Sequence, residues 1–128
     1  MKYSVDKRTD LTVFKLMEEN LNTLVAPKLK SEIIILNNEG VKNLILDLSE
    51  TKYVDSSGLS AILTANRITN KIGGTFMLTG TENPTVKKLI SISRIDSVIN
   101  IVPTVQEAID YIMLERLERE IRGGDEEE

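Results

Sequence analysis

The sequence predicts an α/β fold in which a mixed sheet of about five strands is covered by about four helices. Apolar residues alternate with polar ones near the N-terminus, short apolar runs recur later, and segments with helical spacing separate these runs. The resulting order of elements, ββαβαβαβα, favours a mixed sheet with helices packed on it. At 128 residues the chain has the size of one domain.

The N-terminal segment predicts a β-hairpin. Tyr3 and Val5 alternate with polar residues, Arg8-Thr9-Asp10 is typical of a turn, and residues 11–16 alternate again. Two strands joined by so short a connection should pair antiparallel.

A first helix is expected after residues 20–23. Asn22 or Thr23 can cap it, and Pro27 falls in its first turn, where a missing N–H group does little harm. The helix should end near Gly40. Its predicted inward face consists of Leu24, Val25, Leu29, Ile33 and Leu36.

The middle of the chain predicts a buried strand followed by a second helix. Residues 44–48 are almost continuously apolar, as expected for a central strand that helices cover. Helical spacing extends from about 57 to 72 and stops at Gly73-Gly74, a typical helix terminator.

The remaining elements follow the same alternation. Residues 75–79 and 98–102 predict strands, and Asn83-Pro84 should begin a short helix between them. Residues 104–107 form a capping box before a final helix, which we expect to end at about Arg122.

The domain should occupy residues 1–117. Residues 118–128 are expected to form the helix end and a disordered acidic tail.

Composition excludes several classes of function. The chain has no cysteine and no histidine, so thiolate and imidazole metal sites, thiol nucleophiles and the usual general base are absent. Neither a G-x-G-x-x-G nor a Walker pattern occurs, and we expect no cofactor. A net charge of -4 argues against a nucleic-acid partner.

No membrane insertion is expected. No apolar run approaches the ~20 residues that span a bilayer, and the first residues lack the apolar core of a signal peptide. We therefore expect a cytoplasmic protein.

The junction after the central strand is the strongest candidate for a functional site. Asp55-Ser56-Ser57-Gly58 should form the start of the second helix, where free N–H groups and the helix dipole favour negative charge. A serine there is suited to carry or contact a phosphate. The simpler interpretation is that Ser56 or Asp55 caps the helix, and that Gly58 permits close packing.

Four features in order carry a family resemblance: the central strand 44–48, residues 55–59, the helix ending at Gly73-Gly74, and residues 84–89. With them the chain resembles anti-sigma factor antagonists of the STAS domain family over roughly residues 3–115. The resemblance implies a STAS-like domain that binds an anti-sigma factor, which is itself a serine kinase. It also implies that phosphorylation of Ser56 ends this binding.

The resemblance also assigns a docking surface. It comprises the loop 20–23 and the helix start, with Gly58 allowing close approach of the partner, and its residues are Asn20, Asn22, Thr23, Asp55, Ser57, Gly58 and Ser60. The chain departs from the family at one place, because the usual Gly-Glu-Leu-Asp reads Glu19-Asn20-Leu21-Asn22 here.

Two alternatives stay open at this stage. The same domain could be a constitutive adaptor subunit of a transport or stress-signalling complex without phosphorylation, which Asn22 slightly favours. An enzyme acting through Ser56 ranks last, because no histidine is present as a base. We expect no enzymatic activity.

Overall fold

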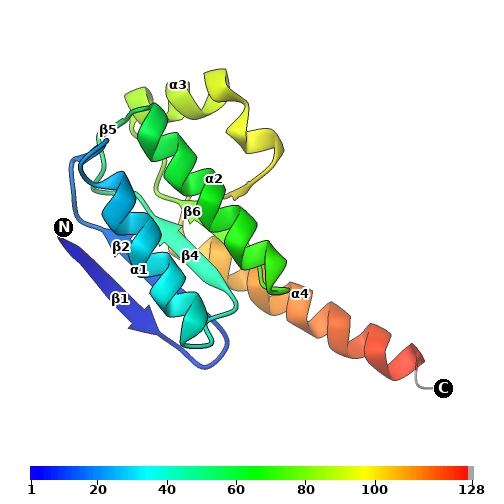
Figure 1. The fold of residues 1–128 in the computed structure, drawn as a ribbon. Coiled ribbons are helices and arrows are strands. Elements are labelled where there is room, and N and C mark those ends of the chain that lie inside the picture. Colours follow the sequence, from blue (N-terminus) through cyan, green and yellow to red (C-terminus); the bar gives the residue numbers. More distant parts are fainter. Residues whose placement is uncertain (127–128) are drawn as a thin grey trace.

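The computed structural model describes residues 1–126 (Figure 1). The elements, in order, are β1 (Tyr3–Lys7), β2 (Thr12–Leu16), β3 (Asn20–Leu21), α1 (Ala26–Asn38), β4 (Leu44–Asp47), β5 (Tyr53–Val54), α2 (Ser56–Lys71), β6 (Phe76–Thr79), α3 (Pro84–Ser93), the 3₁₀ helix η1 (Ile95–Ser97), β7 (Asn100–Ile101) and α4 (Val105–Glu126).

The main sheet has five strands in the order β1-β2-β4-β6-β7. The hairpin β1–β2 is antiparallel as predicted, and the pairs β2–β4, β4–β6 and β6–β7 are parallel. Together with the four α-helices, this mixed sheet confirms the predicted fold class. The structure adds a second, two-stranded sheet formed by β3 and β5, which the sequence did not predict.

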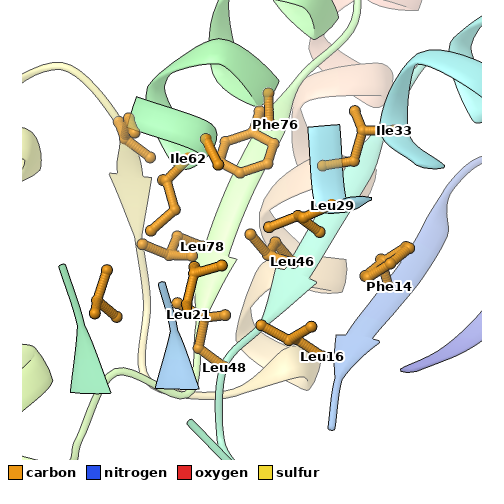
Figure 2. Close-up of a cluster of buried hydrophobic side chains, with 14 of the residues drawn as sticks. Phe14, Leu16, Leu21, Leu29, Ile33, Leu46, Leu48, Ile62, Phe76 and Leu78 are labelled. Carbon is orange, nitrogen blue, oxygen red and sulfur yellow. The ribbon is translucent and has the colours of Figure 1, made fainter. Parts of the chain in front are cut away.

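Both faces of the main sheet are covered, which explains the apolar run in β4. Leu44 and Leu46 point toward the cluster that α1 and α2 cover, whereas Ile45 points toward α4. Figure 2 shows the larger cluster, in which Phe14, Leu46 and Phe76 of the sheet face Leu29 and Ile33 of α1 and Ile62 of α2.

The boundaries of α1 and of the last strand correct two expectations. The first helix begins at Ala26, and Val25, without a side-chain cap, occupies its N-cap position. Leu24 therefore precedes the helix, and its side chain is 78% exposed instead of facing inward. The last strand, β7, has only the residues Asn100–Ile101, because η1 precedes it.

The final helix is longer than predicted. Ala108 and Ile112 pack on the sheet, and Thr75 Oγ1 donates a 2.6 Å hydrogen bond to Glu115. Beyond this point α4 projects past the rest of the domain (Figure 1) and continues to Glu126 instead of ending at Arg122. Residues 127 and 128 of the predicted disordered tail lie outside the described residues.

Within residues 1–126, no helix is both long enough and apolar enough to cross a bilayer.

The central strand provides a test of the core. Leu46 is fully buried, so Leu46→Ala should lower the free energy of unfolding by about 2–5 kcal/mol, since it removes buried methyl groups and leaves a cavity. Urea denaturation measures this loss. The matched control is Leu114→Ala on α4, where the side chain is 61% exposed and the change should stay within about 0.5 kcal/mol. Equal losses for both variants would contradict the burial of Leu46 and the exposure of Leu114.

Candidate functional site

The two short strands β3 and β5 bring the predicted site together. They pair in parallel, with Leu21 opposite Val54, and the Asp55 N–H donates a 3.1 Å hydrogen bond to the Leu21 carbonyl. Leu21 and Val54 are both buried. Because the strands run side by side in the same direction, the loop after β3 lies next to the start of α2, although more than 30 residues separate them.

Asp55 caps α2 and places Ser56 at its first position. The Asp55 backbone is extended, and its Oδ1 accepts a 2.9 Å hydrogen bond from the Gly58 N–H. This is the geometry of an N-cap, so Asp55 has the capping role that the sequence left open between Asp55 and Ser56. Ser56 itself is exposed at the helix start.

Thr23 connects the loop to the helix start. Its hydroxyl lies 3.5 Å from Oδ2 of Asp55, to which it donates, and 3.4 Å from the hydroxyl of Ser57. The Ser57 side chain thus faces the loop, whereas Ser56 faces solvent. Two adjacent serines consequently have different surroundings, and Ser56 is the more accessible one.

Asn22 stabilises the turn that precedes α1. Its side-chain oxygen accepts hydrogen bonds from the N–H groups of Leu24 at 3.1 Å and Val25 at 3.2 Å. The amide side chain is therefore engaged by its own loop, as expected for an Asx turn. Asn22 caps this turn and not α1 itself.

Gly58 is buried under the strand pair. A Cβ atom at this position would collide with the Leu21 carbonyl oxygen, would lie 2.7 Å from Val54 Cγ1 and would lie 2.8 Å from Leu21 Cγ. Close packing within the chain therefore accounts for glycine here.

Asn20 and Ser60 lie at the edges of the predicted surface. Asn20 is exposed on β3, opposite Tyr53. Ser60 is exposed one helical turn beyond Ser56, and its hydroxyl accepts a 3.5 Å hydrogen bond from the Lys30 ammonium group of α1. The structure thus brings all eight predicted site residues to one end of the domain.

The sequence analysis missed two apolar residues of this region. Leu24 is 78% exposed in the loop that follows Thr23, and Tyr53 is 47% exposed in β5. Helical spacing placed Leu24 in the core, so its exposure became visible only with the true start of α1. Exposed apolar side chains beside a polar site are typical of protein-binding surfaces.

Two groups with raised pKa values lie elsewhere. A hydrogen bond to the Glu32 carboxylate raises the pKa of Tyr3. Glu50 raises the pKa of Lys15, because it accepts a hydrogen bond from the ammonium group and attracts its charge at 3.0 Å. Both groups belong to the β1–β2 hairpin, and not to the candidate site.

Comparison with known proteins places this geometry in a family. The family model described as STAS domain matches residues 2–108. The chain belongs to the STAS domain family. The match spans the sheet, the start of α2 and the first turn of α4.

Two similar Thermotoga proteins share the name of putative anti-sigma factor antagonist. A Thermotoga neapolitana protein named as a putative anti-sigma factor antagonist is 29% identical over 75 residues, which cover 59% of this chain and 66% of that protein. A crystal structure of the Thermotoga maritima protein with a corresponding name has a TM-score of 0.76 and 26% identity, covering 87% of this chain and 94% of that chain.

The phosphorylated form of the Bacillus cell fate determinant SpoIIAA has the same fold. Its TM-score is 0.65 at 22% identity, over 87% of this chain and 99% of that chain.

The packing of Gly58 predicts that any side chain there is harmful. Gly58→Ala should lower the free energy of unfolding by about 1–3 kcal/mol, since the added methyl group must displace β3. The matched control is Gly123→Ala in α4, where nothing lies within 4 Å of the added Cβ and alanine should be neutral or stabilise the helix by up to about 1 kcal/mol. A Gly58→Ala protein as stable as wild type in urea would refute the close contact.

The cap at Asp55 makes a second prediction. Asp55→Ala removes the acceptor for the Gly58 N–H and should cost about 1 kcal/mol of unfolding free energy. Asp55→Asn keeps an oxygen in the same place and should cost less. Equal stability of wild type and Asp55→Ala by thermal denaturation would show that the cap contributes nothing.

Proposed function

We propose that this protein is an anti-sigma factor antagonist, a binding domain and not an enzyme. It docks an anti-sigma factor with serine kinase activity through the loop 20–23 and the helix start 55–60. The observation that carries the proposal is the placement of Ser56, exposed at the first position of α2 directly after the capping Asp55. The names of the curated relatives support it.

A phosphate on Ser56 would be compatible with the fold. It adds about -1.5 to -2 charge at neutral pH, and the dipole of a helix N-terminus stabilises negative charge by about 0.3–1 kcal/mol. Because Ser56 is exposed, this charge stays in contact with water. The fold of SpoIIAA is known in a phosphorylated form, which supports the same compatibility for this chain.

The effect of phosphorylation falls on the interface. A phosphate on Ser56 is a dianion beside the Asp55 carboxylate. When it contacts a partner surface that had accommodated a neutral hydroxyl, it must lose water without gaining a compensating cation. A loss of about 3–4 kcal/mol in binding free energy weakens the affinity for the partner more than a hundredfold. The modified protein would then release its partner and keep its structure.

A constitutive adaptor subunit is the second candidate, and Asn22 favours it. The family's usual carboxylate is an amide here, and this amide is occupied by the Leu24 and Val25 N–H groups. Under this proposal Ser56 stays unmodified and the same surface holds its partner permanently.

Mass spectrometry and binding together separate the two candidates. After incubation with a candidate anti-sigma factor kinase and ATP, wild type should gain the mass of one phosphate and Ser56→Ala should gain none. Ser60→Ala is the matched control, since Ser60 is also exposed but lies one turn later, and it should still gain the phosphate.

Calorimetry then tests the proposed switch, which is the release of the partner when Ser56 becomes charged. Ser56→Ala should bind the partner as tightly as wild type, and Ser56→Asp should bind at least about tenfold more weakly, because aspartate supplies part of the phosphate charge. Undiminished binding by Ser56→Asp, together with no added mass on wild type, would favour the adaptor and refute the switch.

A further inference from the structure

A groove begins at Ser56 and runs along α2. Its volume is about 580 Å³, and it lies between the outer face of α2 and the segment that follows α3. Figure 1 shows that segment, in yellow, beside α2. The lining residues on which the inference depends are Ser56, Leu59, Leu63, Arg67, Arg94 and Val98.

Four of the residues that line the groove are apolar, and the others are hydroxyl residues and the two arginines. Leu63 is 40% exposed and Val98 is 62% exposed, while Leu59 is half-buried against the core. An apolar concave surface next to a regulated position is the arrangement into which a partner places an apolar side chain.

The charges of the groove have one sign. Arg67 and Arg94 line it, and no aspartate or glutamate among the side chains that the structure describes does so. Among the ion pairs of residues 1–123, whose side chains the structure describes, none involves either arginine. Arg94 has a left-handed backbone (φ 58°) at the end of α3, where the chain turns into η1 along the groove. Both cations are thus available to an acidic ligand.

We propose that this groove takes a segment of the partner protein that carries apolar side chains together with carboxylates. The inference rests on the proposed function, because it describes how the same partner extends beyond the helix start. Apolar side chains of the segment contact Leu63 and Val98, and its carboxylates face the two arginines.

The acidic character of the segment gives phosphorylation its effect. Ser56 lines the same groove as the two arginines, and Arg67 follows it by eleven residues, about 16 Å along the helix axis. A phosphate on Ser56 would therefore add negative charge to the groove and reduce the net attraction between the groove and the carboxylates of the segment. Release would then follow from this weaker attraction.

The test uses two synthetic amphipathic peptides and the ¹⁵N-labelled full chain. Both peptides have the same length and leucine positions; one carries glutamates and the other lysines. In NMR titrations at low salt, the glutamate peptide should shift amide signals of residues 59–67 and 93–98, and the lysine peptide should not.

Variants assign the effect to the groove. The double change Arg67→Gln and Arg94→Gln should weaken binding of the glutamate peptide about five- to tenfold, since each exposed ion pair contributes little on its own. Ser56→Asp should also weaken it. The matched control is Arg119→Gln on α4, an exposed arginine outside the groove, which should leave binding unchanged. Arg67→Gln alone, on an exposed helix face, serves as the reference should the double variant unfold.

Outcomes for the groove and for the switch are distinct. Equal shifts with both peptides, or none with either, would overturn the groove as an acidic-segment site even if the kinase modifies Ser56. Glutamate-selective shifts at the groove that weaken in the double variant support it, even if the kinase adds no phosphate.

Discussion

The pairing of β3 with β5 holds the loop 20–23 against the start of α2, and the position of Ser56 depends on this pairing. Each strand has only two residues, so few backbone hydrogen bonds hold the pair. Its stability comes from burial of Leu21 and Val54 and from the close approach of Gly58 to Leu21. The side chains at the surface can therefore be polar and exposed, because the structure beneath them is packed.

This arrangement separates structural from functional roles over four consecutive residues. Asp55 caps the helix, Ser57 faces the Thr23 hydroxyl, and Gly58 packs directly against Leu21 of β3. Ser56 is the residue of this group that points to solvent. A charge added there meets a helix start that tolerates it, and under the proposed function the partner protein is what rejects the charge. The proposed switch needs no rearrangement of the domain, only a surface whose charge can change.

The main elements of the fold could be predicted because their patterns are local. The apolar run 44–48 required cover on both faces, and the helix ends had recognisable terminators. The strands β3 and β5 could not be predicted, because two residues are too few for an alternating pattern and their pairing joins segments more than 30 residues apart. Leu24 was misplaced because helical spacing alone does not locate the first residue of a helix.

Part of the candidate site could also be predicted, because its sequence pattern is local. The run 55–58 indicates a helix start, and the family resemblance selected Ser56 from it. The contact of Thr23 with Asp55 and Ser57 and the arginine-lined groove depend on tertiary structure. Sequence spacing gives no sign that Arg67 and Arg94 share a surface, since they lie on different elements.

Amide hydrogen exchange at Asp55 measures whether the β3–β5 pair stays closed when Ser56 is charged, because the Asp55 N–H group donates to the Leu21 carbonyl across the strand pair. This amide should be protected to a similar degree in the unmodified protein and in protein carrying phosphoserine at position 56, since the charge acts on the interface and leaves the β3–β5 pair intact. Loss of protection on phosphorylation would mean that the modification opens the β3–β5 pair, and would contradict a switch that acts through surface charge alone.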